Sequence, residues 1–292
     1  MKKSTNVLLW IIAFLLTIGI AFYQRKTGPT QPLNDRVTLG DTQFKCSLKR
    51  THGGEDNHKI ELTIPDSAIT GFVIWKHFKL DEPLHHIILE RENDKLIAFL
   101  PHQPPVGKLE YQIVLNGHQE EIKLPTKKPA VIRFKGEVPL WILIPHIIAM
   151  FGALFLATRA TIAAFFGHRA KILTTYVVGF LLAGGIILGP LVQKYAFGTL
   201  WTGWPLGEDL TDNKTALTLV FWLLALWRLR GADGERKGRW FVMLAFIVMF
   251  GVYLIPHSMK GSELDYSSLP ADSLENAVVK DSMDSIDTVR IE

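Results

Sequence analysis

The apolar residues of this chain collect in five long runs that carry almost no charge. The runs cover residues 7–23, 138–157, 172–192, 216–227 and 240–256. A helix that crosses a bilayer needs roughly 20 apolar residues, so the second and third runs suffice and the first and fifth lie at the lower limit. The fourth run spans only when it is extended to residues 215–229. We therefore predict a membrane helix bundle of five spans and exclude a soluble α/β enzyme, because that class lacks such runs.

A different pattern fills residues 36–135. Short runs there alternate apolar with polar residues, and turn-forming residues separate them at regular intervals. Asn116 and Gly117 lie between two of these runs, and this pair is typical of a type I′ hairpin turn. About seven or eight strands in such a length indicate an inserted extracytoplasmic all-β, immunoglobulin-like sandwich. In it, Trp75 either fills the core or anchors the surface.

The formal charge of +4 is unevenly distributed. Residues 260–292 hold eight acidic and three basic side chains, so the rest of the chain carries +9. Basic residues gather in two predicted links between helices, Arg159, Arg169 and Lys171 in one, and Arg228, Arg230, Arg236, Lys237 and Arg239 in the other. Basic links remain in the cytoplasm, and this explains the charge better than nucleic-acid binding does.

These links predict the order of the domains across the membrane. We expect a cytoplasmic amino end (1–6), a signal-anchor helix (7–23), an extracytoplasmic β-sandwich domain (24–137), a four-helix membrane domain (138–257) and an acidic, disordered outer tail (258–292). No cleavage site for a signal peptidase follows Tyr23, so the first helix should stay attached. The expected location is a bacterial inner (plasma) membrane, with the lipid bilayer and other membrane or extracytoplasmic proteins as partners.

Cysteine and histidine place limits on the chemistry. Cys46 is the only cysteine, so no intramolecular disulfide forms. Seven histidines lie in the predicted β domain, where we expect solvated surface positions. His85 and His86 are adjacent, so on a strand they point to opposite faces and cannot share a metal ion without a bulge. We find no hydrolase triad and no phosphate-binding glycine loop, and the domain is expected to be a binding or spacer module.

The link between the third and fourth predicted helices contains the most informative residues, Trp201, Trp204, Asp209, Asp212, Asn213 and Lys214. One interpretation is an aromatic belt at the membrane interface, with Asp212 capping the next helix. A second is a calcium or magnesium site, in which Glu263 and Asp265 join the carboxylates of the link. A third is structural pairing of Lys214 with Asp209 or Glu263.

Two histidines are expected on the same side of the membrane. His146 lies within the second apolar run, and His257 follows the fifth. A histidine at membrane depth faces protein or a cavity rather than lipid, so by default it indicates a site. For His146 the alternative is a packing histidine whose hydrogen bonds are satisfied.

The segment Trp201-Thr202-Gly203-Trp204, followed by Asp209 and an apolar helix, resembles the tryptophan-rich outer-face loop of haem-handling cytochrome c assembly membrane proteins. The match covers about thirty residues, and in that family histidines near the loop ligate haem iron. The resemblance implies an aromatic platform from Trp201 and Trp204, with haem as cofactor and with His146 and His257 as axial ligands.

Two hypotheses for the function follow. The first is an auxiliary protein of a respiratory or cytochrome-assembly system that binds haem or a quinone at its outer face. The second is a non-catalytic membrane scaffold or sensor whose β-sandwich binds a partner. A transporter is disfavoured because the apolar runs carry no acidic residue and no repeated half. No catalytic residue is identified, and whether the protein is an enzyme stays open.

Overall fold

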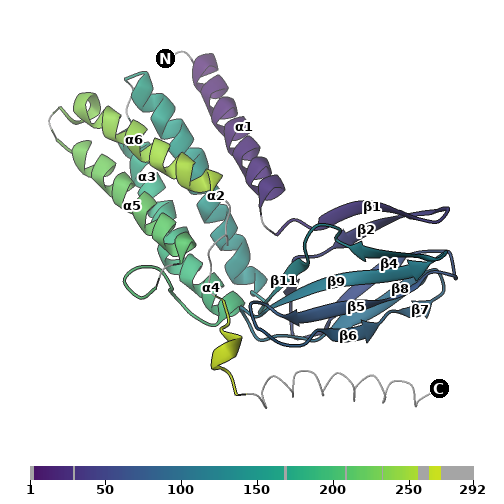
Figure 1. Ribbon diagram of the computed structural model, residues 1–292. Coiled ribbons are helices and arrows are strands. Elements are labelled where there is room, and N and C mark those ends of the chain that lie inside the picture. Colours follow the sequence, from purple (N-terminus) through teal and green to yellow (C-terminus); the bar gives the residue numbers. More distant parts are fainter. Residues whose placement is uncertain are drawn as a thin grey trace. The chain divides into compact units, whose positions relative to one another are not determined.

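The computed structural model describes residues 3–28, 30–167, 170–207, 209–231, 233–255 and 263–270. The chain forms two compact units, which are treated separately below (Figure 1). The helical unit joins Met1–Pro29 to Val138–Ser262, and the β domain joins Thr30–Glu137 to Glu263–Glu292. The first helix therefore belongs with the helices that follow the β domain, and the described part of the tail belongs with the strands.

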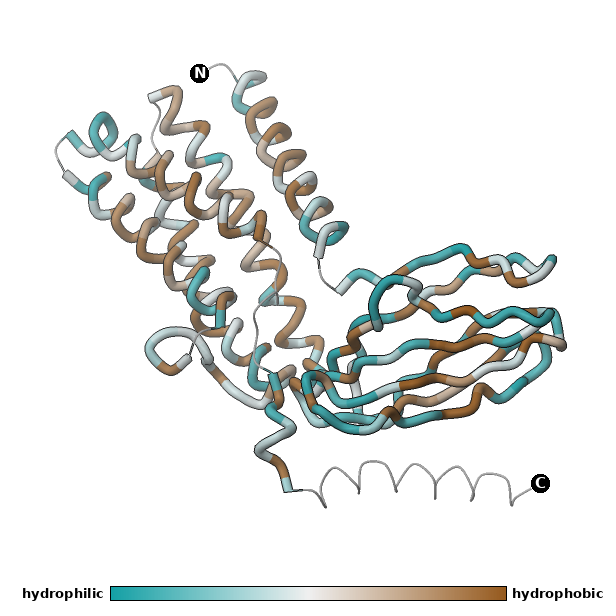
Figure 2. The backbone as a smooth tube through the Cα atoms, in the orientation of Figure 1, coloured by the Kyte–Doolittle hydropathy of each residue, from teal (hydrophilic) through white to brown (hydrophobic). Residues whose placement is uncertain are grey.

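The described helices of the first unit are α1 (Lys3–Thr27), α2 (Leu140–Phe165), α3 (Lys171–Leu181), α4 (Gly189–Phe197), α5 (Leu210–Arg228) and α6 (Gly234–Leu254). A π-helical turn, η1 (Leu182–Leu188), joins α3 to α4 in one continuous helix. Within the described ranges, α1, α2, the α3–η1–α4 helix and α6 are long and apolar enough to cross a membrane. Figure 2 shows these stretches as mainly hydrophobic. This arrangement is compatible with a multi-pass membrane protein.

The helices extend further than the apolar runs suggested. α2 continues to Phe165 and includes Arg159, which the sequence had assigned to a link. Arg159 is 5% exposed, its Nη2 donates to Oδ1 of Asn6 in α1 at 2.6 Å, and its guanidinium lies 5.2 Å from the ring centre of Trp10. The assignment to a link was wrong because α1 supplies polar and aromatic partners that let the guanidinium stay inside the bundle.

Small side chains bring the helices of this unit close together. Ala153, Ala157, Ala160 and Ala164 of α2 are all buried. A face of small residues allows neighbouring helices to approach closely in lipid, where van der Waals packing and hydrogen bonds drive helix association. Many of the large apolar side chains of α1 and α2 point outward and are exposed, as expected for surfaces that contact lipid.

The β domain contains three separate antiparallel or mixed sheets. Its strands are β1 (Leu33–Leu39), β2 (Thr42–Leu48), β3 (Thr51–Gly53), β4 (His58–Thr63), β5 (Thr70–His77), β6 (His85–Ile88), β7 (Glu90–Glu92), β8 (Lys95–Leu100), β9 (Lys108–Gly117), β10 (Glu120–Leu124) and β11 (Ala130–Lys135). The sheets have the orders β1-β2, β3-β11-β9-β5-β6 and β4-β8-β7, and β10 pairs with β9. Buried side chains from all three sheets form one hydrophobic core. The predicted β-rich insertion is thus confirmed.

The core of this domain includes aromatic and histidine side chains. Trp75 is buried and its ring stacks on that of His85 at 4.4 Å between centres, so it fills the core. His58 and His77 are also buried. The expectation of solvated histidines is therefore wrong for these two, because His52 and Glu82 give them polar partners inside the protein.

The predicted hairpin exists, but its turn lies two residues later. β9 continues through Asn116 and Gly117, and the positive φ angles belong to His118 (53°) and Gln119 (64°). Asn116 pairs with Thr70 of β5, and this neighbouring strand keeps it in the ladder. Gly117 is needed for close approach, since a Cβ atom there would lie 2.9 Å from Cγ1 of Ile69.

Candidate functional site

The loop between α4 and α5 is held by side chains from the start of α5. Oδ2 of Asp212 accepts hydrogen bonds from the backbone N–H groups of Thr202 (2.7 Å) and Gly203 (3.0 Å). Oδ1 of Asn213 accepts from the N–H of Trp204 at 2.7 Å. The helix thus fixes three consecutive peptide groups. Gly203 permits this contact, because a Cβ atom there would lie only 2.6 Å from Cβ of Asp212.

The cap of α5 is Asp209, whose Oδ1 accepts from the N–H of Thr211 at 2.7 Å. The expectation that Asp212 caps this helix was wrong, because the chain enters the helix three residues earlier and leaves Asp212 to bind the loop. Both carboxylates and the amide of Asn213 therefore bond to nearby backbone. In the described residues, no group of three or more His, Cys, Asp and Glu side chains is arranged to hold a metal ion.

The fixed loop presents large apolar side chains. Trp204 is 79% exposed and Leu206 is 78% exposed. Nε1 of Trp201 donates to the carbonyl oxygen of Trp204 at 3.3 Å, so the two predicted platform residues are joined within the loop itself. Exposed indole and leucine side chains in a loop between two apolar helices are typical of the membrane interface.

His146 lies near the start of α2 and contacts the π-helical turn. Its Nδ1 is 2.9 Å from the carbonyl oxygen of Gly184, which also accepts the N–H of Gly189. A carbonyl only accepts, so Nδ1 carries the proton and Nε2 of the neutral ring is the acceptor nitrogen. The imidazole is partly buried. Its proposed companion, His257, lies outside the described residues.

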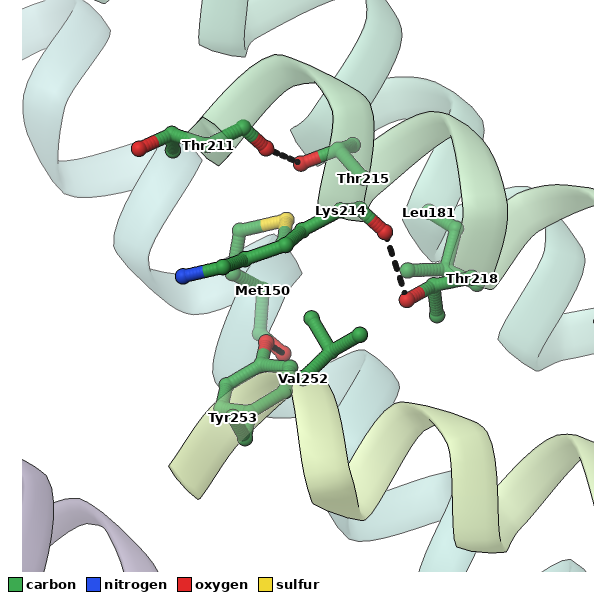
Figure 3. A pocket seen from close by; sticks show the side chains of 8 residues that line it. All are labelled: Met150, Leu181, Thr211, Lys214, Thr215, Thr218, Val252 and Tyr253. Carbon is green, nitrogen blue, oxygen red and sulfur yellow. Dashed lines mark hydrogen bonds between the residues drawn. The ribbon is translucent and has the colours of Figure 1, made fainter. Parts of the chain in front are cut away.

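Lys214 lines a small cavity among α2, α3, α5 and α6 (Figure 3). The cavity measures about 30 Å³. Its polar lining is mostly engaged: Thr215 and Thr218 donate to backbone carbonyls of α5, and Tyr253 donates to that of Met150. Nζ of Lys214 donates to the carbonyl oxygen of Ile255 at 3.3 Å, directly after α6. The positive charge of Lys214 therefore interacts favourably with the negative, carboxyl-terminal end of the α6 dipole.

Glu263 and Asp265 lie on the β domain. The carboxylate of Glu263 bridges Nζ of Lys79 (2.6 Å) and Nζ of Lys108 (2.7 Å). Asp265 caps a short 3₁₀ turn, η2 (Tyr266–Ser268), by accepting from the N–H of Ser267 at 3.0 Å. Burial alone raises the pKa of Glu263, but hydrogen bonds from Lys108 and Lys79 lower it overall. The observed partners of Glu263 are therefore lysines of the β domain.

The same segment inserts Tyr266 into a pocket of the β domain. The side chain is 3% exposed, and its hydroxyl donates to Oε1 of Gln103 (3.1 Å) and accepts from the backbone N–H of Lys108 (2.9 Å). The ring lies 4.5 Å from that of His77, centre to centre. Gly107 provides the space for the tyrosine hydroxyl, because a Cβ atom at this position would lie 2.9 Å from the hydroxyl oxygen. His77, Gln103, Gly107 and Lys108 are called the tyrosine pocket below.

Sequence reasoning did not identify the tyrosine pocket or Lys79. One signal was available, since Tyr266 is the single aromatic residue in the acidic, serine-rich stretch 258–292. An isolated aromatic side chain in such a segment is a candidate anchor. Its pocket could not be found in this way, because it is built from residues more than 150 positions away.

Comparisons with protein-family models, with curated proteins and with solved structures find no match for this chain.

Proposed function

We propose that this chain is a non-catalytic membrane scaffold or sensor whose β domain binds a partner outside the cytoplasm. The observation that carries the proposal is the surface of the β domain that binds a short segment, Glu263–Pro270, through a buried tyrosine and two lysines. In the helical unit, by contrast, the carboxylates of Asp209 and Asp212 bond to nearby backbone. Such groups stabilise a structure rather than bind a substrate.

The bundle is proposed to have five spans, and the tail supports α5 as the fifth. Glu263 contacts Lys79 and Lys108, so the tail and the β domain lie on one side of the bilayer. Eight peptide steps from Ile255 to Glu263 reach at most about 29 Å, less than the roughly 40–45 Å of a complete bilayer. So short a tail favours an α6 that ends on the side of the β domain. If α2, the α3–η1–α4 helix and α6 each cross once, we infer that α5 crosses as well.

The proposed orientation places the β domain outside the cytoplasm of a bacterial cell, with α1 as a signal anchor. The basic side chains between α5 and α6, together with those of the adjoining helix ends, support a cytoplasmic position for that end of the bundle: Arg228, Arg230, Arg236, Lys237 and Arg239. Arg159 lies near the end of α2 that faces the same side in this topology.

An immunoglobulin-like fold is proposed for the β domain. The order β3-β11-β9-β5-β6 supports it, with β3 parallel to β11 and the other pairs antiparallel. A buried tryptophan, Trp75, lies on β5 inside this sheet, and immunoglobulin domains likewise carry a buried tryptophan on a central strand. Such domains present binding surfaces on a rigid framework, which fits the proposed role.

A photo-reactive residue tests the partner-binding role. Introduced in place of the exposed Asp81, beside this surface, in the full chain within its native membrane, it should form one discrete adduct with another protein. The same residue in place of Lys123, on β10, is the control and should form none. Equal labelling from both positions, or none from either, would contradict a binding role for this surface.

A second candidate is haem or quinone binding at the outer face, as in an auxiliary protein of a respiratory or cytochrome-assembly system. It is favoured by one observation, the Nδ1–H hydrogen bond from His146 to Gly184, which leaves Nε2 for iron. An absorption spectrum of the protein, purified in detergent after expression with haem supplied, decides between the two. A Soret band that is lost in His146→Ala would support this candidate, and a spectrum without one supports the scaffold.

A further inference from the structure

We propose that the tyrosine pocket, together with Lys79, recognises a short segment of a partner protein with an acidic residue three positions before a tyrosine. The inference rests on the proposed binding role of the β domain and specifies the partner. In this structure the chain's own Glu263-Leu264-Asp265-Tyr266 occupies the site and shows which chemistry fits it.

The tyrosine provides the selectivity. Its hydroxyl satisfies two groups of the β domain at once, the amide oxygen of Gln103 and the backbone N–H of Lys108. A phenylalanine fills the same volume but leaves both groups without this partner, and a site built for a hydroxyl discriminates strongly against its absence. The absence of a side chain at Gly107 creates the space.

The two lysines provide the charge complementarity. Both ammonium groups reach one carboxylate, at 2.6 and 2.7 Å. Both also lie over the ring of Phe78, at 5.1 Å for Lys79 and 5.0 Å for Lys108. Phe78 therefore helps to hold the two cations close together. A neutral residue in place of Glu263 would leave two like charges side by side.

The backbone conformation of Lys79 also supports a binding site at this position. Lys79 adopts φ of 63°, in the left-handed region that a residue with a Cβ atom seldom occupies. A strained backbone conformation persists only where the surrounding structure holds it in place, and such conformations are common at ligand-binding positions. This turn and the docked segment line an open cavity of about 260 Å³ that includes Phe78, Leu80 and Leu264. A longer partner segment has room there for a further side chain.

The tail competes with a partner because it is tethered. Docking of the tail is intramolecular, and such docking corresponds to an effective concentration of about millimolar. A free peptide of equal intrinsic affinity cannot displace the tail at micromolar concentration. A partner with more contacts, for example in the cavity beside Leu80, can do so. The tail therefore sets the minimum affinity that a partner needs in order to bind this site.

The test uses the full chain in detergent and a fluorescein-labelled peptide with the sequence of residues 263–270. Tyr266→Ala empties the pocket, and this variant should bind the peptide at least about tenfold more tightly than the wild-type chain does. An otherwise identical peptide with alanine in place of tyrosine should bind about tenfold more weakly or not at all. Lys108→Met added to Tyr266→Ala should weaken binding, and Lys123→Met added instead should not.

Protection of the buried Cys46 thiol from a thiol reagent verifies that the β domain of each variant remains folded. Equal binding of the two peptides, or no binding by a folded Tyr266→Ala chain, would overturn the inference. If the position 81 photo-adduct with a partner still forms in that case, the proposed function stands and only the peptide chemistry is wrong. Loss of both would overturn both.

Discussion

Lowering the pH protonates His58, and we expect this step to destabilise the β domain. His58 is 3% exposed, and its Nδ1 lies 3.3 Å from Nδ1 of His52. Burial, followed by the charges of His52 and Lys49, lowers the pKa of His58 from 6.5 to about 4. The folded domain therefore resists protonation more strongly than the unfolded chain does. Its stability is complete above pH 6.5 and declines as the pH falls towards 4.

The size of the effect follows from the two pKa values. At about pH 5 the unfolded imidazole is almost fully protonated and the folded one hardly at all, which costs about 2 kcal/mol relative to neutral pH. The population of the opened domain should then rise by roughly 30-fold. Burial also lowers the pKa values of His77 and His102, so these two residues should make the loss of stability with falling pH steeper.

Cys46 provides the assay, because it is the only cysteine and is buried in the core of the same domain. Its labelling by a dithiopyridine reagent, which reacts in acid, reports opening at each pH. The full chain is compared with His58→Gln, which cannot titrate at this position. The variant should keep the contributions of His77 and His102 but lose the part due to His58. If its pH dependence between 7.5 and 5 equals that of the wild type, the reasoning about His58 is refuted.

Three further predictions concern the loop, the tail and the topology. Gly203→Ala should lower the free energy of unfolding by about 1–3 kcal/mol in a thermal melt, because the added Cβ would lie 2.6 Å from Cβ of Asp212. Gly251→Ala is the control and should not lower it, because no atom lies within 4 Å of the added Cβ. Glu263→Gln should lower the hydrogen-exchange protection factors of 263–270 several-fold, whereas Glu121→Gln should not. Because the pKa of Glu263 is lowered, its contribution is lost only in acid below the usual pKa of 4.5, where the protection factors of this segment should fall as well. A reporter fused after Gly234 should be cytoplasmic and one after Asn116 external, and matching sides would contradict five spans.

Length and apolar content along the chain were enough to locate the helices, because insertion into lipid depends on consecutive residues. α1, α2 and α6 lie where the apolar runs are, and the alternation of residues 36–135 located strands such as β4 and β9. The ends of these elements were less predictable. Arg159 lies inside α2 since Asn6 and Trp10 contact it from α1, and β9 passes Asn116 because β5 pairs with it.

The roles of the candidate site residues depended on tertiary contacts. The composition of the segment after Gly198 marked Asp209, Asp212 and Asn213 as important, but only the fold separates the helix cap from the two side chains that hold the loop. Glu263 shows the limit most clearly. Its lysine partners lie 155 and 184 residues earlier, and no local preference of the chain joins positions so far apart. They meet because the turn after β5, the start of β9 and the tail pack in one domain, where the partial burial of Lys108 and Glu263 strengthens the attraction between those two charges.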